Sequence, residues 1–168
     1  MAQLKPIQIQ GWLKDVNDNF AAIAPVGSDI GLGNLRVARF LFDAAAKDTA
    51  GANNLAVGAH KVPVQLPIHA IIVGGFVDVN TAVTSTNSTA TVAISVESAN
   101  DIISAAQVNG APWSTIGRKA IVPKANTPES TSVKCTAARD ITVTVAVEAL
   151  TAGKFTGYLY YLEGIASA

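Results

Sequence analysis

Histidine and cysteine, the side chains most used for nucleophilic and metal chemistry, are scarce in this sequence. It contains two histidines, His60 and His69, and one cysteine, Cys135. A zinc site requires three or four His, Cys or carboxylate ligands at short spacings, and the sequence offers no such group. We expect His60 to lie in solvent on a loop and His69 to be half-buried in a strand. Cys135 falls in a predicted strand, so we expect a small packed thiol rather than a nucleophile.

Motifs for phosphate, acyl and calcium chemistry are all incomplete. Residues 31–33 begin like a dinucleotide-binding motif, but Arg36 stands where the third glycine belongs. Ser114 lacks the first glycine of a Gly-x-Ser-x-Gly nucleophile elbow. Residues 15–19 alternate oxygen ligands as a calcium loop does, but Phe20 occupies the sharp turn, which needs glycine. The sequence therefore predicts no catalytic residues, no cofactor and no metal site, and we expect the protein not to be an enzyme.

The balance of charge excludes several classes of partner. The 168 residues include 12 Lys and Arg and 12 Asp and Glu, so the net charge is zero. A nucleic-acid-binding protein normally has a basic stripe, whereas the only adjacent basic residues are Arg118 and Lys119. The longest apolar run, residues 70–77, is too short to span a bilayer, and no apolar signal region begins the chain. We expect no nucleic acid, no membrane partner, and synthesis in a reducing compartment.

The chain is poor in charge as well as neutral. Charged residues make up 14% of it and hydrophobic residues 49%, against about 25% charged in an ordinary soluble protein. Outward positions of the predicted strands are mostly Thr, Ser and Ala, whereas exposed sheets usually carry Lys and Glu. We favour a surface that other molecules cover. The alternative is an ordinary sandwich with a threonine-rich face.

The first 34 residues differ from the rest and are predicted to form an N-terminal arm. Large apolar side chains recur at helical spacing in residues 8–23, namely Trp12, Leu13, Val16, Phe20 and Ile23. This pattern predicts a short amphipathic helix that ends before Pro25. Residues 27–34, which are rich in glycine, predict a flexible linker.

From residue 35 onward, apolar and polar residues alternate, which predicts strands with one buried face. The alternation is clearest in residues 62–68, 90–97 and 142–147. Pro63 and Pro67 place the first of these segments at a sheet edge. Residues 101–106 fit either a strand or a single helical turn. Other strands are predicted at residues 36–43, 70–83, 119–122, 131–135 and 155–163, with turns that include 84–88 and 151–153.

Eight or nine short strands with one clear helix indicate an all-β protein. We predict a jelly-roll-like β-sandwich over residues 35–168, preceded by the short helical arm of residues 1–34.

Several ordered blocks of the β domain carry a resemblance to a known family. They are GFVDV at residues 75–79, TAV at 81–83, ATVAISVE at 90–97, PWSTIGRK at 112–119, TAAR at 136–139 and ALTAGKF at 149–155. These blocks resemble the capsid decoration (cement) or head-fibre proteins of tailed bacteriophages. The resemblance implies a virion structural protein that stabilises the capsid by bridging neighbouring major capsid subunits. It also implies a place on the outer capsid surface, synthesis in the host cytoplasm, and two partners: the major capsid protein and copies of itself in a dimer or trimer.

Large side chains are the candidates for docking or self-association. Those of the arm are Trp12, Leu13, Val16 and Phe20. The alternative is that the arm helix packs on its own sandwich. Trp113 is either an exposed loop anchor or a plug for the open end of the sandwich. Residues 158–161 place aromatic rings on both faces of the last strand, so one face must point away from the core.

Two other functions stay open at this point. A phage fibre or receptor-binding module would recognise host-surface glycan, with Trp113 and Tyr158 or Tyr160 as a stacking platform. A small hydrolase would need a histidine, a carboxylate and a nucleophile in one cleft. The fold alone does not distinguish these functions, because one fold can serve many functions. The residues of the functional site must distinguish them.

Overall fold

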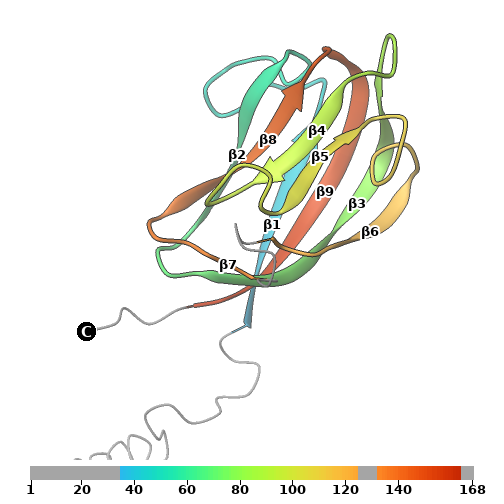
Figure 1. Cartoon of the computed structure of the whole chain (residues 1–168). Coiled ribbons are helices and arrows are strands. Elements are labelled where there is room, and N and C mark those ends of the chain that lie inside the picture. The colour runs from blue at the N-terminus through green and yellow to red at the C-terminus, as the bar shows by residue number, and fades with distance from the viewer. Residues whose placement is uncertain (1–34, 125–131, 164–168) are drawn as a thin grey trace, which may run out of the picture. The chain divides into compact units, whose positions relative to one another are not determined.

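The computed structural model describes residues 35–124 and 132–163, all within one compact unit, Leu35–Ala168 (Figure 1). The predicted arm of residues 1–34, with its helix and linker, lies outside the described residues. The described part forms nine β-strands and no helix. The strands are β1 (Leu35–Asp43), β2 (Gly58–Leu66), β3 (Ile71–Ser85), β4 (Thr91–Ser95), β5 (Ile103–Gln107), β6 (Gly117–Ile121), β7 (Val133–Lys134), β8 (Arg139–Ala146) and β9 (Leu150–Leu162).

These strands form two antiparallel sheets, so the all-β prediction is confirmed. The five-stranded sheet has the order β1-β9-β3-β6, and β7 pairs with the first residues of β3. The four-stranded sheet has the order β2-β8-β4-β5. The sheets pack face to face, and their facing side chains share one hydrophobic core (Figure 1). β5 and β6 each end a sheet on the same side of the molecule, where a groove lies between them.

Aromatic side chains fill the centre of the core. Phe42 stacks on Phe155 with ring centroids 5.1 Å apart, and Trp113 lies 4.9 Å from Phe155. All three side chains are at most 1% exposed. Phe40 lies over Gly157 of the neighbouring strand, where the Cβ of any other residue would overlap its ring. Burial of each such ring stabilises the fold by roughly 2–3 kcal/mol.

The strongly alternating segments form strands as predicted over most of their length. Ile68, which the alternation places on the buried face, instead lies in a turn after β2 and is 51% exposed. Val92 and Ile94 on β4, and Val143 and Val145 on β8, are all 0% exposed. β2 lies at the edge of its sheet, and its ladder with β8 is irregular around Pro63, which has no N–H to donate. Residues 103–107 form β5, so the strand is the correct alternative for residues 101–106.

Two other local predictions are wrong. Residues 151–153, predicted as a turn, lie inside β9, because the ladder with β3 continues to Leu150 and Gly153 packs against Val83. The alternation predicts that Val147 faces the core. In the structure β8 ends at Ala146, and Val147 has a φ of 72° and is 74% exposed.

Candidate interaction surface

The two histidines occupy different environments. His60 lies on β2 and is 3% exposed, so the prediction of a solvated loop residue is wrong. Its Nε2 donates to the carbonyl of Ala56 at 2.9 Å, and its Nδ1 lies 3.5 Å from the Asp48 carboxylate. His69 is half-buried as predicted, but it lies in a turn with a φ of 66° rather than in a strand.

Cys135 is a packed thiol, as predicted. It is 0% exposed, and desolvation by burial, with the nearby Glu97 and Asp101 carboxylates, raises the pKa of its thiol to about 11. The backbone N–H of His69 donates to the Cys135 carbonyl at 2.8 Å, so the backbones of the two residues are in direct contact. A thiol with this pKa is protonated at neutral pH and is not an activated nucleophile.

Two acidic side chains, Glu97 and Glu148, hold loops and strands together. Arg139 donates to both carboxylate oxygens of Glu97 at 2.7 and 2.8 Å, which lowers the pKa of Glu97 to about 2. Glu148 accepts hydrogen bonds from Ser85, Asn87 and Thr89, which lower its pKa to about 2. In the part of the chain that the structure describes, no group of three or more His, Cys, Asp or Glu could hold a metal ion. The same residues contain no helix suited in length and hydropathy to cross a membrane.

Trp113 is inside the molecule rather than on its surface. It is 0% exposed, and its Nε1 donates to the carbonyl of Val92 at 3.1 Å. The prediction of an exposed docking anchor is therefore wrong, and the alternative of a plug between the sheets describes its position. The other docking candidates lie outside the described residues, and their role stays a prediction: Trp12, Leu13, Val16 and Phe20.

The outer face of the five-stranded sheet carries half-buried aromatic side chains. On β9, Tyr158 and Tyr160 alternate with Leu159, which is 0% exposed, and with Tyr161, which packs against the core. The prediction of aromatic rings on both faces of this strand is thus confirmed. Because Trp113 packs on the inner side of the sheet, it does not form a stacking platform with the two outward tyrosines.

Cross-strand pairing brings these tyrosines beside apolar side chains of β1 and β3. Tyr158 is paired with Phe76, and their rings stack with centroids 4.5 Å apart. Tyr160 meets the same ring edge-on at 6.2 Å and is paired with Val37, which is 54% exposed. The Arg39 guanidinium lies 6.0 Å from the Tyr158 ring centroid. We call this group the apolar patch, and it comprises Leu35, Val37, Phe76, Tyr158, Tyr160 and Leu162.

The apolar patch covers one end of the outer face, and the other end carries charged side chains together with the exposed Leu41. Asp78 on β3 is paired with Arg118 on β6. Asp43 and Lys154 form an ion pair of 2.9 Å, and the hydrogen bond from Lys154 lowers the pKa of Asp43. Large apolar side chains that are exposed next to one another mark a surface that another molecule covers. The patch is therefore the candidate interaction surface of the described domain.

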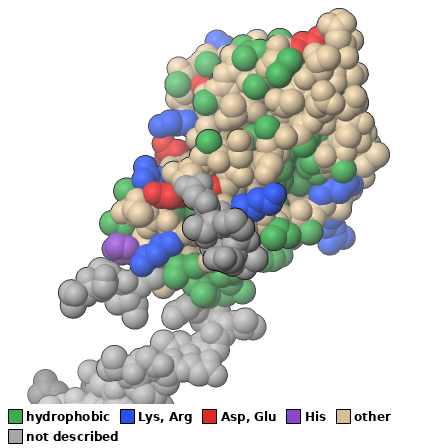
Figure 2. All heavy atoms as spheres, in the orientation of Figure 1, with side chains coloured by type: hydrophobic (Ala, Val, Ile, Leu, Met, Phe, Trp, Pro, Cys, Tyr) green, Lys and Arg blue, Asp and Glu red, His purple; other side chains and the backbone are tan. Residues whose placement is uncertain are grey.

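The four-stranded sheet has a different outer face. Its outward positions include Thr91 and Ser95 on β4 and Thr142 and Thr144 on β8, which are small and uncharged. The same outer face also carries the Lys61–Asp140 ion pair of 2.7 Å, and Figure 2, viewed from the side of β4 and β5, shows charged side chains among the tan ones. The prediction of outward Thr, Ser and Ala is correct for this sheet and wrong for the apolar patch.

Val37 and Phe76 were missed in the sequence because β1 and β3 are apolar on both faces. Periodicity alone does not say which of two apolar faces is buried. One signal was present: Arg39 and Asp43 have the same parity as Val37, so all three residues share the face that must meet solvent.

The fold is similar to that of chains from phage capsids. No protein-family model matches the sequence, and a comparison with curated proteins gives no match. A chain of the capsid of Ralstonia phage GP4 is 19% identical with a TM-score of 0.54, over 86% of this chain and 94% of that chain. A chain of the cyanophage Pam1 capsid asymmetric unit is 22% identical with a TM-score of 0.52, over 83% and 91%. A chain of the acidic stable capsid of Helicobacter pylori bacteriophage KHP30 is 14% identical with a TM-score of 0.51, over 76% and 86%.

Proposed function

We propose that this chain is a structural protein of a bacteriophage virion. It decorates the outer capsid surface and stabilises the shell by bridging neighbouring major capsid subunits, and it performs no catalysis. The observation that carries the proposal is the likeness to chains from three phage capsids, which extends over 86–94% of those chains. Because the likeness covers nearly the whole of each neighbour, it concerns a complete domain rather than a common motif. The role is assigned by analogy of fold.

We also infer that the two sheets have jelly-roll connectivity. A jelly roll has eight strands in two sheets joined by Greek-key connections. Without the two-residue β7, the strand orders are β1-β9-β3-β6 and β2-β8-β4-β5. The first strand thus lies beside the last, and the second beside the one before the last, which supports this topology.

The apolar patch supplies a contact surface for this role. Leu35, Val37 and Leu162 are 36%, 54% and 37% exposed, so a partner that covers them removes apolar area from water. Aromatic side chains such as the stacked Phe76 and Tyr158 dominate the energy of many interfaces. A dimer or trimer would present several patches to one capsid, and effective concentration would then multiply modest affinities. The arm residues of the N-terminal segment are a second proposed contact.

Co-sedimentation with capsids of the parent phage that lack this protein tests the proposal. We expect the wild-type chain to bind at a fixed ratio to the capsid subunits. Val37→Asp places a charge inside the patch, and its desolvation should weaken binding at least about tenfold. Val57→Asp is the matched control, because Val57 lies in a loop outside the patch and is 55% exposed, like Val37 at 54%.

The possible outcomes test the virion role and the apolar patch independently. Failure of the wild-type chain to bind capsids would contradict the virion role. Equal binding of the Val37→Asp and Val57→Asp variants would contradict the patch as the contact surface and leave the role intact.

The glycan-binding alternative loses part of its basis in this structure. Its platform needed an exposed Trp113, which is buried. Specific binding of the purified chain to a glycan array, with no binding to capsids, would favour that alternative.

A further inference from the structure

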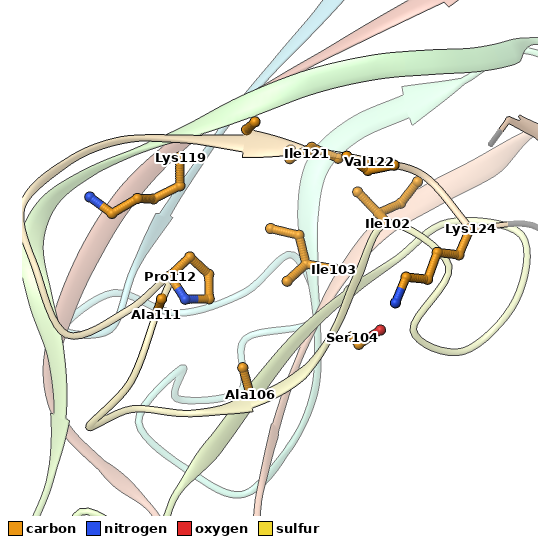
Figure 3. Close-up of a pocket in the computed structure, with 11 residues that line it drawn as sticks. Ile102, Ile103, Ser104, Ala106, Ala111, Pro112, Lys119, Ile121, Val122 and Lys124 are labelled. Carbon is orange, nitrogen blue, oxygen red and sulfur yellow. The ribbon is translucent and has the colours of Figure 1, made fainter.

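A groove lies on the side of the molecule where β5 and β6 end their sheets. Its volume is about 390 Å³. The floor is apolar and includes Ile102, Ile103, Ala106, Pro112 and Ile121 (Figure 3). Ile102 and Ile121 are 2% and 4% exposed, so the floor continues into the hydrophobic core.

Both walls of this β5–β6 groove are strand edges. In the described part of the chain β5 pairs only with β4, and β6 only with β3. An edge strand presents unpaired N–H and C=O groups to which another strand can bind. Ser104 and Ala105 of β5 are small and exposed, so neither side chain shields this edge. Beyond β6, the N–H of Lys124 donates to the Asp101 carbonyl at 2.6 Å, which joins the two walls there.

The charged residues that line the groove are both lysines. Lys119 and Lys124 stand at opposite ends of the apolar floor (Figure 3). Lys119 donates from Nζ to the carbonyl of Ile116 at 3.3 Å, and neither lysine forms an ion pair with a described carboxylate. Lys61 and Lys154, in contrast, bind Asp140 and Asp43 at 2.7 and 2.9 Å. The groove therefore offers one positive charge at each end of an apolar floor.

We propose that the β5–β6 groove binds an extended segment of another polypeptide chain, with apolar side chains at alternate positions and carboxylates near both ends. The segment adds to the free edge of β5 as a strand. Its apolar side chains cover the floor around Ile103 and Ile121, and its carboxylates bind Lys119 and Lys124. This surface is separate from the apolar patch, and its assignment does not depend on the virion role.

A capped peptide, acetyl-Glu-Val-Thr-Val-Thr-Val-Glu-amide, is a suitable probe for the full-length, isotope-labelled protein. We expect saturable changes in the amide NMR signals of residues 103–107 and 117–122. The same peptide with lysine in place of both glutamates should bind about tenfold more weakly at low ionic strength. Absence of changes on β5 and β6, or changes confined to the apolar patch, would overturn the proposal.

Charge-reversal variants then test the two lysines. Lys119→Glu combined with Lys124→Glu should weaken binding of the acidic peptide by about tenfold at low ionic strength, and by less at high salt. Lys47→Glu is the matched control, since Lys47 is exposed and lies outside the groove. Ser104→Phe fills the groove from an exposed position and should block binding while the melting temperature stays unchanged. If the double variant binds as tightly as Lys47→Glu, the assigned chemistry is wrong.

Discussion

Gly157 is the position where a single added methyl group tests the packing of β1 against β9. It is paired with Phe40, and a Cβ on Gly157 would overlap three atoms of the Phe40 ring. Both residues face the core, where Phe40 is 2% exposed and Gly157 is buried. In the Gly157→Ala variant the ring must therefore move inside a closely packed interior.

Two effects of opposite sign determine the stability of Gly157→Ala. Replacing glycine inside a strand lowers the entropy of the unfolded chain and stabilises the fold by about 0.5–1 kcal/mol. Overpacking a buried core costs about 1–3 kcal/mol. The second effect is larger because the buried ring has no solvent-filled space to enter. We expect a net loss of about 1–2 kcal/mol, which lowers the melting temperature by roughly 2–8 °C.

Thermal and urea unfolding followed by circular dichroism measure this loss. Gly74→Ala is the matched control, because a Cβ on Gly74 of β3 meets no atom within 4 Å. We expect that control to be neutral or stabilised by up to about 1 kcal/mol. Adding Phe40→Leu to Gly157→Ala should recover part of the loss, since leucine is shorter than the ring. If Gly157→Ala is as stable as Gly74→Ala, the inferred clash with Phe40 is wrong.

Three further predictions concern single side chains. Val147→Asn should raise the free energy of unfolding by about 1 kcal/mol, because a φ of 72° is unfavourable for a β-branched residue and accessible to asparagine; a lower melting temperature would contradict this. The Glu97–Arg139 pair should stabilise the fold above about pH 4.5 and lose its contribution as the pH falls towards 2, since the folded pKa of Glu97 is about 2 and its ordinary value is 4.5. Acid titration of stability should accordingly be flatter in Glu97→Gln, and identical curves would argue against the pair. Cys135, buried and with a thiol pKa of about 11, should react with a disulfide reagent only after unfolding; rapid labelling of the native protein would show that the thiol is accessible.

The strands could be predicted from the sequence wherever one face is buried and the other is polar. In β8, Val143 and Val145 are buried and alternate with half-buried Thr142 and Thr144, so the period of two reports burial directly. The same reasoning fails at Val147, which continues the alternation after the strand has ended. A positive φ has no hydrophobic signature, so hydropathy does not reveal it.

The candidate surfaces could not be predicted, because each depends on which strands are neighbours. The apolar patch forms only when β9 lies between β1 and β3, which sets Phe76 beside Tyr158. The groove requires β5 and β6 to be the last strands of their sheets. The position of His60 could not be predicted for the same reason. The sequence around it, between Gly58 and Lys61, is typical of a loop, but pairing with β8 places His60 in a strand. Asp48 and Ala56 then contact its ring.

Most carboxylates of the described domain already have partners within the domain. Every described carboxylate except that of Asp78 accepts a hydrogen bond or forms an ion pair within the domain, namely those of Asp43, Asp48, Glu97, Asp101, Asp140, Glu148 and Glu163. These groups fix turns and join strands, so they do not neutralise Lys119 and Lys124 in the groove. The domain therefore has an apolar patch and a positively charged groove, which require partners of different chemistry. The proposed bridging role would need two distinct contact surfaces, and the described residues carry two candidates, the apolar patch and the β5–β6 groove.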